Sequence, residues 1–338
     1  MAAPESNRTM RAVQMSRFGG PEVFEVIETP RPIPGPGQVL VRVRAAGVNL
    51  SETLIRQNRY AMTTELPAVL GNEVAGVIES LGSGVGGLSI GARVVAPLFA
   101  AGALVGGYAE YVLIDAGFVA LLPDALSFEE ATALMIQGLT ALYLINQVPP
   151  QGKTVLVSAA AGGVGSLLLQ LAKRAGARTV IAAASTTDKL DFARSLGAHA
   201  GVNYTQADWV EQARAASGGA GPDIIYESVG GAVTNGSLKA LAPLGQLVIY
   251  GALNIQSFQL GVPELLDLIF KNQSVTGFAF VPLLTLEGLR TGLAELFELA
   301  VCGQLRITIS ETFSLEHAAE AHRALEERRT VGKLVLVP

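Results

Sequence analysis

The stretch whose residue types could do chemistry is a glycine-rich turn between two apolar runs. The run 155–158 is valine-rich, as a buried parallel strand is, and residues 167–172 place leucine and alanine at helical spacing. Between them lies Ala160-Ala-Gly-Gly-Val-Gly165, a dinucleotide pattern with alanine in first place. Such a turn aims helix N-terminal amides at a diphosphate, and the candidate contacts are Ala161, Gly162, Gly163 and Val164. The alternative is a buried glycine turn without a ligand, and the flanking sequence decides between the two.

Composition limits the functional class. The chain has 338 residues, half of them hydrophobic and 16% charged, and this length predicts about two domains with substantial cores. The formal net charge is −5 and no lysine or arginine stripe stands out, so we expect no nucleic-acid partner. No apolar run reads as a membrane span, and the first residues lack the apolar stretch of a secretory signal. We expect a cytoplasmic protein without a membrane partner.

Cysteine and histidine are too sparse for a metal cluster. Cys302 is the only cysteine, which excludes a disulfide within the chain and a thiolate site. His317 and His322 are five residues apart in a helix-like stretch, so they do not share one face as two metal ligands would. We expect them on a solvated or half-buried helix, and we predict no metal site.

Two patterns of secondary structure divide the chain. Short strands and glycine turns dominate the first 125 residues, and the run 38–45 alternates as a half-exposed strand does. Ser127 opens a capping box, after which strands and helices alternate. The expected strands are 154–158, 179–183, 201–204, 223–228, 246–251 and 274–277. This rhythm predicts an α/β protein with a doubly wound parallel sheet and a ligand at the carboxyl ends of its strands. A closing strand at 332–337 is expected to rejoin the β-rich part.

This order of parts resembles the medium-chain dehydrogenase/reductase superfamily over essentially the whole chain. The sequences that carry the resemblance are Ala45-Ala-Gly-Val-Asn49, Gly71-Asn-Glu-Val-Ala-Gly76, Gly107-Tyr-Ala-Glu-Tyr111, Met135-Ile-Gln-Gly-Leu-Thr-Ala141, Ala159-Ala-Ala-Gly-Gly-Val-Gly165 and Val331-Gly-Lys-Leu-Val335. The resemblance implies a GroES-like, mainly-β catalytic domain, residues 1–125 and 282–338, and a Rossmann dinucleotide-binding domain, residues 126–281. It also implies a homodimer paired along the edge of the dinucleotide domain.

Two asparagines stand where the zinc branch of that superfamily has metal ligands. Asn49 takes the place of its cysteine ligand, and Asn72 takes the place of its histidine ligand. Asparagine is a poor zinc ligand beside thiolate and imidazole, so we expect no zinc. The chain therefore resembles the zinc-free, quinone oxidoreductase-like branch, which delivers hydride from NADPH to a conjugated acceptor.

The end of the second alternating strand indicates NADPH. An NAD site needs a carboxylate there for the ribose 2′-hydroxyl, whereas this strand ends in Ala183-Ala-Ser185. We interpret Asp188 as part of a capping box that Ser185 opens. Ser185 and Lys189 are four residues apart and can offer a hydroxyl and an ammonium to a 2′-phosphate. Tyr204 matches an aromatic residue that zinc-free members place near this phosphate, and a core or rim tyrosine is the alternative.

The resemblance also implies contacts for the nicotinamide end of the cofactor. They are Asn49, Thr140, Gly251, Ala252, Phe278 and Lys333. The glycine, the alanine and the phenylalanine follow the fifth and sixth strands, at the sheet edge where the fold places its ligand. A solvated strand lysine is the alternative for Lys333.

Reduction of a conjugated acceptor builds negative charge on its carbonyl oxygen, so the site needs hydrogen-bond donors. The candidates are Asn49, Tyr60 and Tyr108. Leu54 stands where quinone-reductase relatives often carry a tyrosine, and it is a further candidate for the substrate site. The spacing from Asn49 to Tyr60 is instead similar to that of enoyl thioester reductases, in which the matching tyrosine is the catalytic donor. We predict Tyr60 and Asn49 as the catalytic pair, with a rim tyrosine as the alternative for Tyr60.

Three functions remain open at this point. The first is an NADPH-dependent, metal-free reductase of a quinone or an α,β-unsaturated carbonyl. The second uses the same chemistry on an enoyl-CoA or enoyl-ACP thioester. The third is a crystallin-like or regulatory protein that binds NADPH with little turnover, which is disfavoured because polar cleft candidates survive in the sequence.

Overall fold

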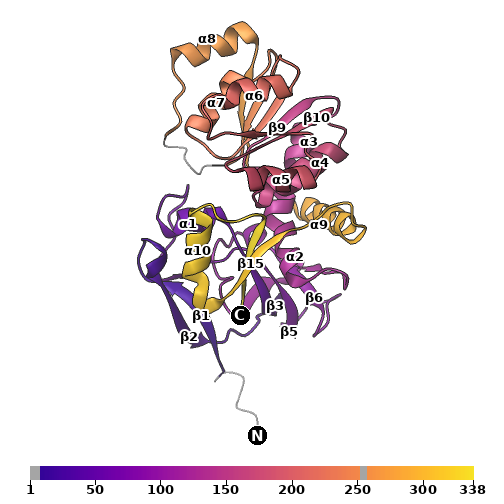
Figure 1. Ribbon diagram of the computed structural model, residues 1–338. Coiled ribbons are helices and arrows are strands. Elements are labelled where there is room, and N and C mark those ends of the chain that lie inside the picture. The colour runs from indigo at the N-terminus through magenta and orange to yellow at the C-terminus, as the bar shows by residue number, and fades with distance from the viewer. Residues whose placement is uncertain (1–7, 252–256) are drawn as a thin grey trace. The chain divides into compact units, whose positions relative to one another are not determined.

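The computed structural model describes residues 8–251 and 257–338 (Figure 1). Contacts divide the chain into two units, Met1–Leu139 with Leu284–Pro338, and Thr140–Leu283. The boundaries expected from the sequence, 125/126 and 281/282, assign residues 126–139 to the dinucleotide domain. In the structure this helical segment belongs to the first unit, because its residues contact the β-rich part.

The first unit is mainly β. Its strands are β1 (Thr9–Met15), β2 (Phe24–Pro30), β3 (Gln38–Val48), β4 (Ala68–Val69), β5 (Val74–Leu81), β6 (Arg93–Ala96), β7 (Tyr111–Asp115), β8 (Ala120–Leu121), β15 (Ile309–Ser314) and β16 (Lys333–Val337). Within the described residues they form a three-stranded sheet, β2-β1-β4, and a seven-stranded sheet, β15-β16-β3-β5-β6-β8, in which β7 also pairs with β3. The closing strand β16 runs antiparallel to β3, so the end of the chain rejoins the β-rich part as expected.

Helices and one-turn segments connect the strands of the first unit. They are α1 (Leu50–Arg56), α2 (Phe128–Ala133), α9 (Leu286–Val301), α10 (Ala318–Glu326) and the one-turn segments η2 (Pro21–Val23), η3 (Leu98–Ala101), η4 (Ala116–Phe118), η5 (Leu134–Gly138) and η8 (Leu315–His317). The predicted capping box at the start of α2 is present. Ser127 Oγ accepts from the Glu130 N–H at 3.1 Å, and the Ser127 N–H donates to the Glu130 carboxylate at 2.9 Å.

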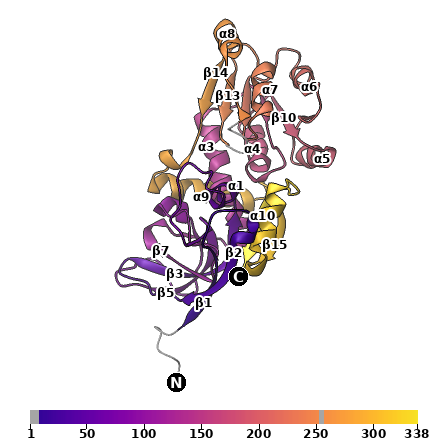
Figure 2. The ribbon, with the colours of Figure 1, turned by 90° about the vertical axis from the view of Figure 1, so that its left-hand side faces the viewer.

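The second unit contains a fully parallel sheet (Figure 2). Its strands are β9 (Thr154–Val157), β10 (Thr179–Ala184), β11 (Ala200–Asn203), β12 (Ile224–Glu227), β13 (Gln246–Ile249) and β14 (Ser274–Gly277). Its helices are α3 (Leu139–Gln147), α4 (Gly163–Arg174), α5 (Thr187–Ser195), α6 (Trp209–Ala216), α7 (Ala232–Ala240) and α8 (Val262–Lys271), with the one-turn segment η7 (Val281–Leu283). Among the described residues the strand order is β11-β10-β9-β12-β13-β14, which confirms the predicted doubly wound sheet.

Each unit has a core of its own. In the second unit every residue of β9 is buried, because neighbouring strands pair on both edges and helices cover the sheet. In the first unit, apolar residues of β3, β5 and β16 meet those of α10. No helix in the described ranges has the length and apolar character that crossing a membrane requires.

Candidate active site

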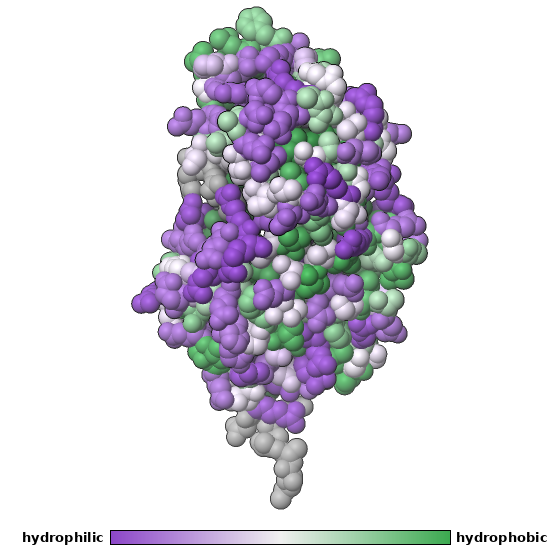
Figure 3. Space-filling view, viewed as in Figure 1, coloured by the Kyte–Doolittle hydropathy of each residue, from purple (hydrophilic) through white to green (hydrophobic). Residues whose placement is uncertain are grey.

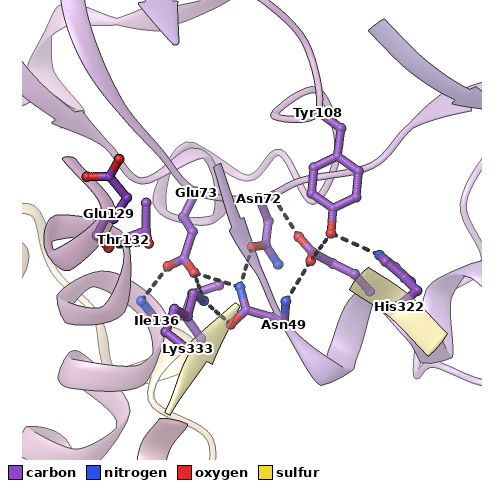
Figure 4. A network of polar contacts seen from close by, with 10 residues as sticks. Asn49, Asn72, Glu73, Tyr108, Glu129, Thr132, Ile136, His322 and Lys333 are labelled. Atoms are coloured by element: carbon purple, nitrogen blue, oxygen red, sulfur yellow. Dashed lines mark hydrogen bonds and ion pairs between the residues drawn. The ribbon is translucent and has the colours of Figure 1, made fainter. Parts of the chain in front are cut away.

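The site in the first unit is a buried polar cluster at one end of β3 (Figure 4). Asn49 follows β3 directly, Glu73 precedes β5, and Lys333 is the first residue of β16. Both β5 and β16 pair antiparallel with β3, with Val74 opposite Ala46 and Leu334 opposite Val48. This register brings Glu73 and Lys333 to Asn49 from strands that are far apart in sequence.

Hydrogen bonds join the cluster into one network. Lys333 Nζ donates to Asn49 Oδ1 at 2.7 Å and forms an ion pair with the Glu73 carboxylate. Asn49 Nδ2 donates to Glu73 Oε1 at 2.7 Å and to Asn72 Oδ1 at 3.1 Å. The Ile136 N–H donates to Glu73 Oε2 at 2.7 Å. Lys333 and Glu73 have no exposed surface, so removing either one would leave an unpaired buried charge, at a cost of about 3–5 kcal/mol.

Two glycines beside this network leave no space for a Cβ. A Cβ on Gly47 would lie 2.3 Å from Glu73 Oε1 and 2.8 Å from Lys333 Nζ, so only glycine leaves space for the ion pair beside β3. Gly71 has a φ of +97°, and a Cβ there would lie 2.7 Å from the Cα of Gly107. The family-specific sequences around these glycines therefore have a physical basis in the site.

A second set of hydrogen bonds centres on Glu52 of α1, which is fully buried. Its carboxylate accepts from the Asn49 N–H at 2.8 Å, the Asn72 N–H at 3.0 Å and the Tyr108 hydroxyl at 2.7 Å. Burial raises the pKa of Glu52 to about 7, and the hydrogen bonds from Tyr108 and Asn49 oppose this shift. His322 Nε2 lies 3.0 Å from the Tyr108 hydroxyl. Burial, with the charge of Arg56, lowers the pKa of His322 well below its usual value, so the imidazole is neutral.

Helix α10 is half-buried, as expected for the stretch that holds the two histidines, and His322 lies on its buried side. His322 has no exposed surface, because its ring packs edge-on against Phe24, with centroids 4.8 Å apart, and against Tyr108 at 5.8 Å. His317, by contrast, is exposed.

Two of the three candidate donors are used inside the protein. Tyr108 is fully buried and its hydroxyl binds Glu52 and His322, which argues against contact with a substrate. Asn49 is 5% exposed, and both hydrogens of its Nδ2 are accounted for by Glu73 and Asn72. Neither side chain has a donor left for an acceptor molecule in this arrangement.

Tyr60 remains accessible. It lies in the loop after α1 and is 37% exposed, and partial burial raises its pKa, so the hydroxyl keeps its proton at neutral pH. Leu54, on the preceding helix, is 7% exposed and packs mainly within the first unit. Tyr60 therefore stays a predicted donor and Leu54 a predicted substrate contact.

The glycine-rich turn of the second unit has the features of a diphosphate site. Gly162 caps α4 without a side-chain hydrogen bond, and the N–H groups of Gly163, Val164 and Gly165 meet no acceptor among the described residues. A Cβ on Gly165 would lie 2.3 Å from the Ala159 carbonyl oxygen, so the close approach of turn and helix needs glycine there. Free amides at a helix N-terminus fit the diphosphate of a dinucleotide.

Comparisons with known proteins agree with this geometry along the chain. Residues 35–124 match the alcohol dehydrogenase GroES-like domain, and residues 163–295 match the zinc-binding dehydrogenase family. A quinone oxidoreductase of Pseudomonas aeruginosa is 35% identical over 97% of this chain and 99% of its own length. A 2-haloacrylate reductase of a Burkholderia species is 34% identical over 97% of this chain and 98% of its own. The crystal structure of Escherichia coli quinone oxidoreductase complexed with NADPH superimposes with a TM-score of 0.88, at 34% identity over 97% of this chain and 100% of the other.

The chain belongs to the quinone oxidoreductase-like branch of the medium-chain dehydrogenase/reductase superfamily. One of the matching families is named for zinc binding. In this chain the two positions of the zinc ligands hold Asn49 and Asn72, and Asn49 forms hydrogen bonds with Asn72 and Lys333. No group of three His, Cys, Asp or Glu side chains in the described part of the chain could hold a metal ion.

Two of the predicted 2′-phosphate residues, Ser185 and Tyr204, lie just after β10 and β11, and the third, Lys189, lies on α5. Ala184 pairs with Asn203, so Ser185 and Tyr204 leave adjacent strands together, and both are half-buried. The capping box expected at Ser185 is wrong, because α5 begins at Thr187 and its cap is Thr186, whose hydroxyl accepts from the Lys189 N–H. Ser185 precedes the helix, so it does not share a helix face with Lys189.

The residues predicted at the nicotinamide end belong to both units, with Asn49 and Lys333 in the first and Thr140, Gly251 and Phe278 in the second. Gly251 and Phe278 follow β13 and β14, and the Phe278 N–H donates to the Ile249 carbonyl at 2.9 Å. Thr140 is the first residue of the second unit, on α3. Ala252 lies outside the described residues. Lys333 is not the solvated strand lysine of the alternative interpretation, because it is fully buried against Asn49 and Glu73.

Sequence reasoning missed the roles of Glu52, Glu73 and His322. The signal for Glu52 was present, because an acidic residue three positions after Asn49 completes a capping box at α1. Nothing local in the sequence indicated the pairing of Glu73 with Lys333, which are 260 residues apart.

Proposed function

We propose that this protein is an NADPH-dependent oxidoreductase that reduces a quinone or an α,β-unsaturated carbonyl compound without a metal ion. The observation that carries the proposal is the turn before α4, with amides free for a diphosphate, in a chain matched end to end by quinone oxidoreductases. The NADPH in the Escherichia coli complex and the name of the Burkholderia 2-haloacrylate reductase support the same chemistry. A haloacrylate is itself an activated alkene.

When bound, NADPH supplies a hydride, so the acceptor gains two electrons and one hydrogen, and a proton from solvent completes its reduction. The N–H groups at the start of α4 hold the diphosphate, and Ser185, Lys189 and Tyr204 hold the 2′-phosphate. Donors in the first unit stabilise the charge that develops on the acceptor oxygen. Tyr60 is one such donor, because its hydroxyl is accessible and protonated at neutral pH.

An enoyl thioester is the second candidate substrate, and the accessible Tyr60 is the observation that favours it. The same hydride chemistry serves both substrate classes, so the proposed cofactor and donor residues are unchanged. The crystallin-like alternative predicts NADPH binding with no acceptor consumed.

The test is steady-state NADPH oxidation with 9,10-phenanthrenequinone, an alkenal and crotonyl-CoA, beside a direct measurement of NADPH binding. Turnover with the quinone or the alkenal, at a rate above the enzyme-free control, is the expected result. Selective turnover of crotonyl-CoA would move the assignment to enoyl thioesters. NADPH binding without turnover of any of the three would overturn the proposal.

We also propose a homodimer formed along the edge of the second unit. Strand β14 ends the parallel sheet, so one of its edges has no partner strand within the described chain. The neighbouring helix α8 exposes large apolar side chains: Val262, Leu265, Leu266, Ile269 and Phe270. Figure 3 shows apolar side chains gathered over α8. A second copy that pairs with β14 would complete the sheet and cover this helix.

A further inference from the structure

Asn72 has an amide nitrogen that the buried network does not use. Its Oδ1 accepts from Asn49, its main-chain N–H donates to Glu52 at 3.0 Å, and its main-chain oxygen accepts from the Phe99 N–H at 3.0 Å. Its Nδ2 meets no acceptor among the described residues, and no dashed line leaves this atom in Figure 4. The residue is only 2% exposed, so one unpaired donor group lies on a nearly buried side chain.

The orientation of the Asn72 side-chain amide follows from the hydrogen bond between Lys333 and Asn49. An ammonium can only donate, so it holds Asn49 Oδ1, and Asn49 Nδ2 must then face Glu73 and Asn72. An N–H that faces Asn72 requires an oxygen there, so Asn72 turns Oδ1 toward Asn49 and Nδ2 away from it. The opposite orientation of Asn72 would set two NH₂ groups against each other.

The free nitrogen is not sealed in the core. In the described part of the chain, the unpaired side-chain atoms that are fully enclosed are Arg56 Nη1, Gln137 Oε1, Ser237 Oγ, Tyr250 Oη and His322 Nδ1. Asn72 Nδ2 is not one of them, so this atom keeps some accessible surface. Leaving a hydrogen-bond donor unpaired on a nearly buried side chain costs free energy, and a bound acceptor would remove this cost. Such donors are typical of ligand-binding sites.

We propose that Asn72 Nδ2 donates the hydrogen bond to the acceptor's carbonyl oxygen, and that Asn49 and Lys333 are positioning residues that aim it. This inference rests on the proposed reductase function and reassigns the role predicted for Asn49. As the β-carbon receives the hydride, the π electrons of the C=C bond shift toward the carbonyl, whose oxygen becomes negative. Asn72 stabilises that oxygen and keeps its own proton, while water supplies the proton that the α-carbon gains.

The test compares variants that keep or lose this one donor. Asn72→Asp retains the shape and the oxygen that accepts from Asn49, but replaces the free NH₂ with a second oxygen. We expect kcat at pH 8 to fall by about 10²–10³-fold while NADPH affinity, measured by fluorescence titration, stays within about threefold. Asn146→Asp, at an exposed position of α3 in the second unit, is the control with the same charge change.

A pH profile gives the signature that a structural role would not produce. The charged groups bonded to this cluster are Glu52, Glu73 and Lys333, and the two carboxylates favour the protonated form of the introduced aspartic acid. Protonation restores an O–H donor at the lost position. The ratio of variant to wild-type kcat should therefore rise as pH falls from 8 to 5.

A flat ratio across this range, or a kcat within about threefold of wild type at pH 8, overturns the inference. If Asn72→Asp does not fold, Asn72→Ser and Asn72→Ala are compared instead, because serine keeps a hydrogen-bond donor and alanine does not. Equal kcat values for these two variants would also overturn the inference. Wild-type protein without turnover would instead contradict the proposed reductase function itself, so the two failures are distinguishable.

Discussion

At the scale of single residues, Glu52 couples folding to pH. Its pKa rises from 4.5 to about 7 because the carboxyl group is fully buried. The folded protein therefore binds this proton more tightly than the unfolded chain does. Between these two pH values the folded state carries more protons, so the free energy of unfolding falls as pH rises.

Glu52→Gln should remove this dependence. Wild type should lose on the order of 3 kcal/mol of unfolding free energy from this group between pH 4.5 and 7, whereas the variant should lack that loss. Urea unfolding at a series of pH values measures the difference. Glu65→Gln, at an exposed site, is the control and should follow wild type. Parallel curves for wild type and Glu52→Gln would contradict the prediction.

Tyr60→Phe tests the other predicted donor. Loss of a hydrogen bond to a developing charge should lower kcat by about 10–100-fold, with NADPH affinity unchanged, because Tyr60 is not among the proposed cofactor contacts. Initial rates at saturating NADPH, with a parallel binding titration, separate the two effects. Tyr111→Phe removes a hydroxyl in the same unit and serves as control. A rate equal to wild type would identify Tyr60 as a rim residue.

The residue types of the site were predictable, but their contacts were not. Asn49 and Lys333 stood out through the family-specific sequences, whereas their bond joins residues 284 positions apart and depends on strand register. Tyr108 illustrates the same limit, because exposure decides whether a tyrosine is a donor to a ligand or a core hydrogen-bond partner. Register and exposure are properties of the assembled sheets rather than of local sequence.

At the scale of elements, the second unit was the more predictable one. Strands β9, β10, β12 and β13 each contain a short apolar run, and the parallel sheet follows from the alternation of strand and helix. The start of α5 was misplaced because Ser185 and Thr186 are both competent caps, and only the backbone path selects Thr186.

Lys189, in the first turn of α5, is predicted to select NADPH over NADH. Lys189→Ala should weaken NADPH binding by about 10–100-fold and leave NADH binding within about twofold, since only NADPH has the 2′-phosphate. Fluorescence titration with each cofactor gives both constants. Lys239→Ala, at an exposed position of α7, should change neither. An equal loss for the two cofactors would remove the phosphate role from Lys189.

At the scale of the whole molecule, the exposed face of α8 is the feature that the monomer leaves unexplained. Phe270 is 81% exposed and Ile269 66%, in a protein whose other large apolar residues mostly lie in the two cores. Apolar side chains gathered on one helix next to an open sheet edge are typical of a subunit interface.

Phe270→Glu should convert the proposed dimer to a monomer, because association would bury an unpaired carboxylate. Analytical ultracentrifugation at micromolar concentration measures the change. Ile90→Glu alters an apolar residue in the first unit that is 67% exposed, and it should leave the dimer intact. A wild-type protein that sediments as a monomer would refute the proposed dimer, and a variant that stays dimeric would place the interface elsewhere.

The lysine of β16 has a consequence for engineering. Replacing Asn49 with cysteine and Asn72 with histidine would restore the ligand types of a zinc dehydrogenase, but it would leave a fixed ammonium beside the intended dication. The ammonium reaches the side chain of residue 49 at 2.7 Å, and like charges at such separations repel strongly in a water-free interior. The Lys333 ammonium and a metal ion thus cannot both lie beside residues 49 and 72. Conversion of this enzyme into a metalloenzyme therefore has to begin by replacing Lys333.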